Sequence, residues 1–155
     1  MNKNNPSGAR KTIQDKVQVL INEFQNEVDW EARYKLIIDK GKRLPALEAH
    51  LKVEENLIKG CQSQVWLVAS VDPTTKRLLL KGDSDALIVR GLVSLLLELY
   101  DDQSPSDVLK ADLSFFEKIG LKSHLSPSRA NGFNSMIKQI YNYALAFNYL
   151  NNKNN

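Results

Sequence analysis

Residues 60–71 read GCQSQVWLVASV, and within this stretch a polar loop gives way to a strand. Between residues 63 and 71 apolar side chains stand at every second position, which predicts a strand with one firmly buried face. The Asp72-Pro73-Thr74-Thr75 run has the chemistry of a turn, and residues 77–81 supply a returning strand. The stretch therefore predicts an antiparallel hairpin with Cys61 just outside its first strand.

Two helices are expected before the hairpin. From Thr12 onward apolar side chains recur at helical spacing, and Thr12 with Asp15 can form an acidic version of the capping box. Asp29 is suited to cap a second helix, which Gly41 and Pro45 bring to an end. Both helices should present one apolar stripe to the core.

The connection over residues 46–59 is weakly patterned, and we expect a loop there. A hairpin of two strands is marginal in isolation. It must therefore be completed either by a third strand, for which residues 54–58 are the candidate, or by helices packed on one face.

More helices are expected after the hairpin. Asp83 or Ser84 should cap a helix that is apolar nearly all round, and Gly91 inside it predicts a close approach by the sheet or another helix. Ser104-Pro105 and Ser126-Pro127 have the residue order of helix starts, and the last helix should reach about residue 150. The predicted fold class is α+β, a small antiparallel sheet packed against several helices, with long N- and C-terminal helices.

Composition predicts one domain over residues 12–150, with disordered tails at 1–11 and 151–155 that are rich in Asn and Lys. The net charge of +3 comes from 21 basic and 18 acidic residues without a basic block, which gives nucleic-acid binding little support. No apolar run resembles a signal peptide or approaches membrane-spanning length, so no membrane association is expected. The expected location is cytoplasmic.

Cys61 is the only cysteine of the chain, which excludes an internal disulfide. With His50 and His124 as the only histidines, too few soft ligands remain for a zinc site or for an iron–sulfur cluster held by this chain alone. A free cysteine is more often a small buried hydrophobe than a reactive group. Here the neighbouring Gly60, the charge of Lys59 and the polar residues that follow favour a reactive thiol.

Four segments of the chain carry a recognisable pattern: Tyr34-Lys35 through Gly41-Lys42-Arg43-Leu44-Pro45, then Gly60-Cys61-Gln62-Ser63-Gln64-Val65-Trp66, then Gly82-Asp83-Ser84-Asp85-Ala86, and finally His124-Leu125-Ser126-Pro127-Ser128-Arg129. They resemble the SufE family of sulfur-acceptor proteins and occur in that family's order, so that the resemblance covers about residues 12–148. The resemblance implies a SufE/IscU-like fold.

The resemblance also implies a function in sulfur transfer. A cysteine desulfurase, SufS-like or CsdA-like, would hold sulfur as a persulfide, and the Cys61 thiolate would take that sulfur by transpersulfuration and so stimulate the desulfurase. The sulfur would then pass to a SufBCD-like iron–sulfur scaffold or, for a CsdE-like acceptor, into other sulfur pathways. The chain itself would be no enzyme and need no cofactor or metal, because pyridoxal phosphate belongs to the desulfurase.

The resemblance places Asp83, Ser84 and Arg129 around the cysteine loop. For Arg129 an ion pair with Asp83 or Asp85 is an equal alternative to a role near the sulfur. The side chains of Gln62 and Gln64 either bond the loop backbone or are solvated at the strand edge. The supporting loop and partner surface are expected to comprise Gly60, Gln62, Ser63, Gln64, Asp83, Ser84, His124 and Arg129.

Two other functions compete with sulfur transfer. A cysteine-nucleophile hydrolase would need a base such as His124 beside Cys61, and a cluster scaffold would need more cysteines. A carrier has a different requirement, because its persulfide must be covered between partners yet reachable within a complex. We therefore expect residues 58–62 to fold Cys61 inward and to swing outward on docking, with Gly60 as the hinge.

Overall fold

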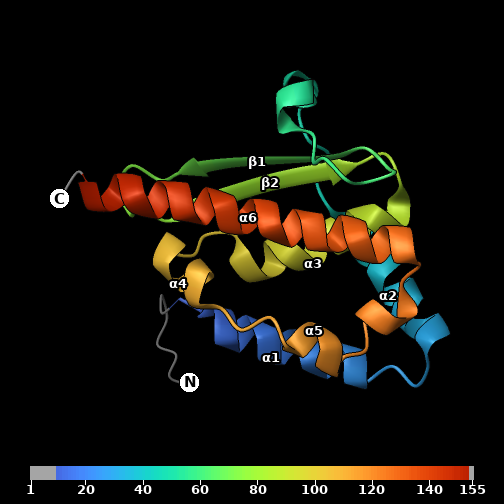
Figure 1. Ribbon diagram of the computed structural model, residues 1–155. Helices are drawn as coiled ribbons and strands as arrows, with labels where there is room; N and C mark the ends of the chain where they lie inside the picture. The colour runs from blue at the N-terminus through green and yellow to red at the C-terminus, as the bar shows by residue number, and fades with distance from the viewer. Residues whose placement is uncertain (1–9, 154–155) are drawn as a thin grey trace.

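The hairpin predicted from the sequence is confirmed in the computed structural model, which describes residues 10–153. Strand β1 (Val65–Val71) pairs antiparallel with β2 (Leu78–Ser84), so that the first residue of one lies opposite the last residue of the other (Figure 1). Helices pack against this pair and the fold is α+β, as expected.

The second strand is longer than expected, and this changes the roles of Asp83 and Ser84. Both residues belong to β2 instead of capping the following helix. That helix, α3 (Leu87–Tyr100), has Ala86 at its N-cap, and no side chain bonds its first turn. The prediction of an Asp or Ser cap was therefore wrong, because ladder pairing with β1 continues to the end of the Gly82-Asp83-Ser84 run.

The two N-terminal helices begin as predicted. Helix α1 (Ile13–Gln25) starts with the reciprocal capping box of Thr12 and Asp15. In α2 (Trp30–Arg43) the Asp29 side chain accepts a hydrogen bond from the backbone N–H of Ala32 at 2.9 Å. Each cap satisfies backbone donors that the helix itself leaves unpaired.

Helix α3 lies in the centre of the molecule and meets α2 at two glycines. A Cβ atom on Gly41 would lie 2.6 Å from the carbonyl oxygen of Leu87, and one on Gly91 would collide with the backbone of Ile37. The close approach predicted from Gly91 is thus confirmed, and the neighbour is a helix. Because Gly41 and Gly91 have no side chains, the backbones of α2 and α3 come into direct contact at this crossing.

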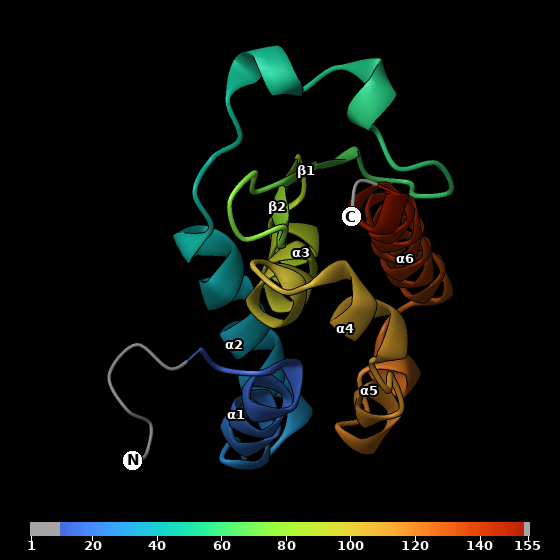
Figure 2. The ribbon, with the colours of Figure 1, turned by 90° about the vertical axis from the view of Figure 1, so that its left-hand side faces the viewer.

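The connection between α2 and β1 projects above the hairpin and carries two short 3-10 turns, η1 (Ala49–Leu51) and η2 (Glu54–Asn56) (Figures 1 and 2). No third strand forms among residues 54–58, where a single bridge joins Leu57 to Trp66. Helices complete the hairpin instead.

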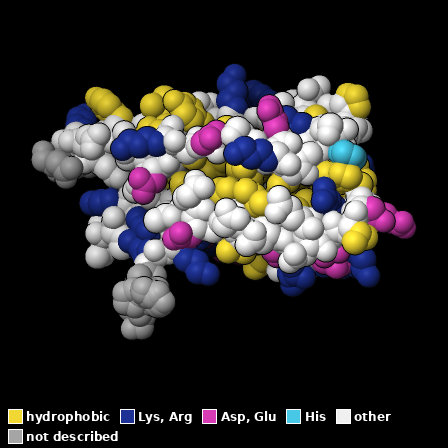
Figure 3. Space-filling view, turned by 90° about the horizontal axis from the view of Figure 1, so that it is seen from below, with side chains coloured by type: hydrophobic (Ala, Val, Ile, Leu, Met, Phe, Trp, Pro, Cys, Tyr) yellow, Lys and Arg dark blue, Asp and Glu magenta, His cyan; other side chains and the backbone are white. Residues whose placement is uncertain are grey.

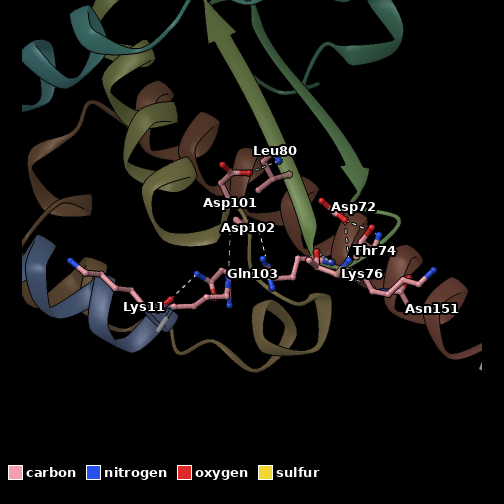
Figure 4. Close-up of polar contacts among 12 residues, drawn as sticks. Lys11, Asp72, Thr74, Lys76, Leu80, Asp101, Asp102, Gln103 and Asn151 are labelled. Atoms are coloured by element: carbon pink, nitrogen blue, oxygen red, sulfur yellow. Dashed lines mark hydrogen bonds and ion pairs between the residues drawn. The ribbon is translucent and has the colours of Figure 1, made fainter. Parts of the chain in front are cut away.

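The C-terminal half contains α4 (Pro105–Lys110), α5 (Phe115–Lys118), the 3-10 turn η3 (Lys122–His124) and α6 (Pro127–Lys153). Helix α6 runs along the hairpin, where the Tyr143 hydroxyl donates to the Leu67 carbonyl at 3.2 Å (Figure 1). Its end lies at the hairpin turn, because Asn151 donates to the Lys76 carbonyl at 3.0 Å (Figure 4).

Helix α6 is longer than the sequence suggested, because residues 151–153 are helical although they were expected to belong to a disordered tail. Of the other expected tail positions, 10 and 11 are described and belong to no helix or strand, although the Lys11 carbonyl accepts a hydrogen bond from the Gln103 side chain at 3.2 Å. Positions 1–9 and 154–155 lie outside the described residues.

The core is one cluster of buried apolar side chains between the hairpin and the helices. Its largest fully buried members include Phe24, Phe116 and Phe133, which come from α1, α5 and α6. On the face seen from below, hydrophobic side chains gather along a central band, with basic and acidic side chains interspersed around it (Figure 3). Within the described part of the chain, no helix is both long and apolar enough to cross a bilayer.

Candidate functional site

The cysteine loop lies between the 3-10 turn η2 and strand β1, and it rests on helix α6. Gly60 has φ +90°, a left-handed conformation that residues with a Cβ rarely adopt. Its Cα faces Ser135 of α6, since a Cβ atom there would lie 3.0 Å from the Ser135 hydroxyl oxygen. Glycine at this position therefore turns the chain toward α6 and allows it to lie close to the helix.

Cys61 is partly buried, and its sulfur lies against the backbone of α6. The Sγ atom is 3.6 Å from the carbonyl oxygen of Gly132, within the range in which a thiol donates a weak hydrogen bond. Burial raises the pKa of the Cys61 thiol, because the charged thiolate loses hydration there. In this conformation burial disfavours the thiolate, which is the nucleophilic form of the group.

Beneath the loop lies a cavity of about 240 Å³ between α3, α6 and the loop. Its walls combine apolar side chains with hydroxyl groups and one guanidinium group. The lining residues are Cys61, Gln62, Ser63, Val89, Leu92, Ser126, Ser128, Arg129, Gly132 and Met136. We call this space the inner cavity.

On the other side of the loop lies a broader hollow of about 560 Å³, which we call the outer groove. It is bounded by the projecting segment that carries η2 and by the start of β1. Residues 61–63 line both hollows, so the cysteine loop is the wall between them.

Of the flanking polar residues, Gln62 and Ser63 line both hollows, whereas Gln64 lines only the outer groove. The bonds at Gln64 involve its backbone, whose N–H donates to Asp85 at 3.0 Å and whose carbonyl accepts from the Ser84 hydroxyl at 2.7 Å. The matched segment around residue 84 therefore anchors the end of the cysteine loop.

Asp83 lines neither hollow, and its contacts are with the projecting segment and with α3. Its buried carboxylate accepts from the backbone N–H of Leu47 at 2.9 Å and pairs with Arg90 at 2.9 Å and Lys52 at 3.3 Å. Burial opposes its ionisation, but the bonds from Leu47 and Ser84 and the nearby cations outweigh burial and lower the pKa of Asp83. Asp83 thus holds the base of the projecting segment.

Arg129 and His124 have different surroundings. Arg129 lines the inner cavity together with Cys61, and the ion pairs of Asp83 go to Lys52 and Arg90. Among the described residues, the alternative ion pair of Arg129 with Asp83 or Asp85 is not formed. His124 stacks on Trp30 with ring centroids 4.0 Å apart. Its Nδ1 lies 2.9 Å from the Gly120 carbonyl, and the residue lines neither hollow.

The comparisons with known proteins identify the family of this chain. The family model described as "SufE: Fe-S metabolism associated domain" matches residues 18–144, which include the cysteine loop, the Asp83 segment and most of α6. The chain belongs to the SufE family.

Two relatives support this assignment to SufE. An uncharacterized SufE-like protein of Rhizobium etli is 43% identical over 138 residues, covering 87% of this chain and 93% of that protein. An uncharacterized SufE-like protein of Rhizobium meliloti is 44% identical over 124 residues, covering 78% of this chain and 89% of that protein. The fold is similar to the solution structure of a hypothetical protein from Thermus thermophilus, with a TM-score of 0.70 at 19% identity over 85% of this chain and 95% of that one.

Several lining residues of this SufE site were not found from the sequence. Val89 and Leu92 belong to a helix that is apolar nearly all round, so nothing in the pattern separates them from ordinary core residues. Gly132 did offer a signal, because a glycine in a helix interior costs roughly 1 kcal/mol relative to alanine and so indicates a close neighbour. That neighbour is Cys61.

Proposed function

We propose that this SufE-family chain is a sulfur acceptor, which takes persulfide sulfur from a cysteine desulfurase onto Cys61. The observation that supports this most directly is the place of Cys61 in the wall between a partly apolar inner cavity and an open outer groove. A thiol in that position can be covered in the free protein and presented to a partner by a short movement of its loop. The family description, which refers to Fe–S metabolism, agrees with this role.

The transfer is a thiol exchange at sulfur. Cys61 loses its proton to solvent, and the thiolate attacks the outer sulfur of the desulfurase persulfide. A new S–S bond forms between Cys61 Sγ and the transferred outer sulfur. The bond between the transferred sulfur and the desulfurase cysteine breaks, and the desulfurase cysteine leaves as a thiolate. The exchange needs no external oxidant or reductant, and removal of the product sulfur frees the desulfurase for another turnover.

The inner cavity gives the transferred sulfur a protected place. Its volume of about 240 Å³ is several times the roughly 30 Å³ that a water molecule occupies in the liquid, so one added sulfur atom can be accommodated. Val89, Leu92 and Met136 supply apolar walls there. A persulfide inside the cavity would be shielded from small thiols, which otherwise remove it by the same exchange chemistry.

The expected partners are a SufS-like or CsdA-like cysteine desulfurase and, for delivery, a SufBCD-like iron–sulfur scaffold in the cytoplasm. The chain would act as an activator of the desulfurase and not as an enzyme, and pyridoxal phosphate would remain with the desulfurase. A cysteine-nucleophile hydrolase is disfavoured because His124, the candidate base, contacts Trp30 and Gly120 instead of Cys61.

The deciding experiment is intact-mass analysis after incubation with a desulfurase and free cysteine. The wild-type chain should gain the mass of one sulfur atom, and dithiothreitol should remove it. Cys61→Ser should gain nothing and should fail to stimulate cysteine turnover, whereas Ser70→Ala is the control, because Ser70 is exposed on β1 and lines neither hollow, and it should load sulfur. Full stimulation of the desulfurase by Cys61→Ser would refute the acceptor role.

Two further measurements define the partner and the loop movement. Binding to a SufS-like and to a CsdA-like desulfurase should differ in affinity, and the tighter pair should also show the larger stimulation. Amide hydrogen exchange at residues 58–62 should change when the desulfurase binds. Exchange that is equally slow with and without the desulfurase would contradict outward movement of the loop.

A further inference from the structure

Gly132 is the point at which the cysteine loop rests on α6. Its carbonyl oxygen accepts a weak hydrogen bond from the Cys61 thiol at 3.6 Å, and its Cα faces the same residue. A Cβ atom on Gly132 would lie 3.2 Å from Sγ and 3.7 Å from the Cys61 Cβ. A separation of 3.2 Å is tighter than an ordinary contact of a carbon and a sulfur atom, so a side chain at residue 132 would push the Cys61 sulfur away by a few tenths of an ångström and weaken the docking of the loop.

A second contact supports the loop on the same face of α6. Gly60 faces Ser135, which follows Gly132 by three residues, and residues separated by three lie on one side of a helix. The two glycines therefore stand on opposite sides of the interface, Gly60 in the loop and Gly132 in the helix. Together they bring the loop backbone and the helix backbone close enough to enclose the thiol between them.

The chemistry of the contact favours the protonated form of the thiol. An S–H group can donate to the Gly132 carbonyl, whereas a thiolate has no proton to donate and faces the partial negative charge of that oxygen. The raised pKa of the Cys61 thiol agrees with this, with burial as its cause. The reactive thiolate therefore forms more readily once the loop has left α6.

We propose that Gly132 is a positioning residue for Cys61, because the absence of a side chain there lets the thiol dock, protonated and covered, against α6 until a partner displaces the loop. This inference rests on the proposed acceptor function for its biological meaning, but its physical content concerns the free protein alone. A side chain at position 132 shifts the equilibrium between docked and undocked loop toward the undocked state.

The test compares Gly132→Ala and Gly132→Val with the wild type, each as the full chain and in the absence of desulfurase. Alkylation of Cys61 by iodoacetamide at neutral pH should accelerate about threefold in the alanine variant and about tenfold or more in the valine variant, as the thiolate fraction rises. The pH midpoint of the alkylation rate should move down in the same order. Amide exchange at residues 60–63 should become faster in both variants.

Asn134→Ala is the matched control, because residue 134 is exposed on α6 and the change likewise favours the helix. Its alkylation rate and pH midpoint should equal those of the wild type. Gly132→Ala should keep the far-UV circular dichroism of the wild type. If both Gly132 variants are folded yet alkylate at the wild-type rate and midpoint, the positioning role is refuted.

Sulfur loading by the desulfurase separates this inference from the proposed function. If the wild type accepts sulfur, the persulfide on Gly132→Val should be removed by glutathione faster than that on the wild type. If the wild type accepts no sulfur at all, the acceptor function fails, while the alkylation series still decides whether Gly132 positions Cys61. Equal removal rates for wild type and Gly132→Val would show that the contact does not shield the persulfide and would overturn that part of the inference.

Discussion

The carboxylate of Asp83 accepts a hydrogen bond from the backbone N–H of Leu47 at 2.9 Å, and this bond joins residues 36 positions apart in the chain. It connects strand β2 to the base of the projecting segment that forms one side of the outer groove. Arg90 of α3 and Lys52 of that segment pair with the same carboxylate. One buried side chain thus fixes three parts of the fold on which the groove depends.

Asp83→Asn should destabilise the protein strongly. The amide is nearly the same shape, but it leaves the guanidinium of Arg90 without a counter-charge in a largely buried place. Removing one partner of a buried ion pair costs about 3–5 kcal/mol, and a loss of about 2–4 kcal/mol is expected here because Lys52 and Arg90 are partly exposed. Urea unfolding measures the loss, with the exposed Glu117→Gln as a near-neutral control.

The same carboxylate predicts an acid dependence of stability. The pKa of Asp83 is lowered in the folded state, so its contribution is present above the unfolded pKa of about 3.9 and is lost as the pH falls through the folded pKa. The difference in unfolding free energy between wild type and Asp83→Asn should therefore shrink below about pH 4. A difference that stays constant down to the acid transition would show that the charge of Asp83 is not responsible.

Gly91→Ala should also destabilise the protein, although alanine favours helix by about 1 kcal/mol over glycine. The added methyl group would collide with the backbone of Ile37, and neither helix backbone can move away without opening the core. Overpacking of this kind typically costs about 1–3 kcal/mol, so the net change should be a lower melting temperature. Thermal unfolding checks this, and a raised melting temperature would mean that α2 and α3 can separate freely.

Features that depend on neighbouring residues could be predicted from the sequence, whereas features that depend on tertiary contacts could not. Thr12, Asp29 and the hairpin turn were predicted because capping and turn chemistry depend on residues a few positions apart. The end of β2 was misplaced because its ladder with β1 continues as far as Ser84, opposite Val65, and no local pattern reveals this pairing. The inner cavity was missed for the same reason, since its walls come from α3, α6 and the loop.

Lys40 predicts a further effect on stability. Its side chain is only 4% exposed, and the ammonium group pairs with Glu23 at 3.1 Å and Glu98 at 2.9 Å, joining α1, α2 and α3. Both carboxylates are partly exposed and can be hydrated once the cation is gone. Lys40→Met should therefore cost only about 1–2 kcal/mol, less than for a pair buried on both sides.

Lys40→Ala is the companion variant, because it removes the packed methylene stem as well as the charge. It should be less stable than Lys40→Met by about 1 kcal/mol or more, and chemical denaturation of the two variants under the same conditions measures the difference. Equal stabilities would mean that the stem contributes nothing to the contact between the three helices.

The reactivity of Cys61 should depend on pH differently in the folded protein and in an unstructured peptide. Burial raises the pKa of the thiol, so its thiolate forms at higher pH in the free protein than in a peptide of residues 58–64. The alkylation rate of the folded chain should therefore rise at a higher pH than the alkylation rate of the peptide. Because the folded pKa is the higher one, the contribution of the buried thiol to stability is complete below the unfolded pKa of about 8.5 and is lost as the pH rises through the folded value. Stopped-flow alkylation from neutral to alkaline pH gives both midpoints, and a midpoint equal to that of the peptide would show that the thiol is hydrated in the free protein.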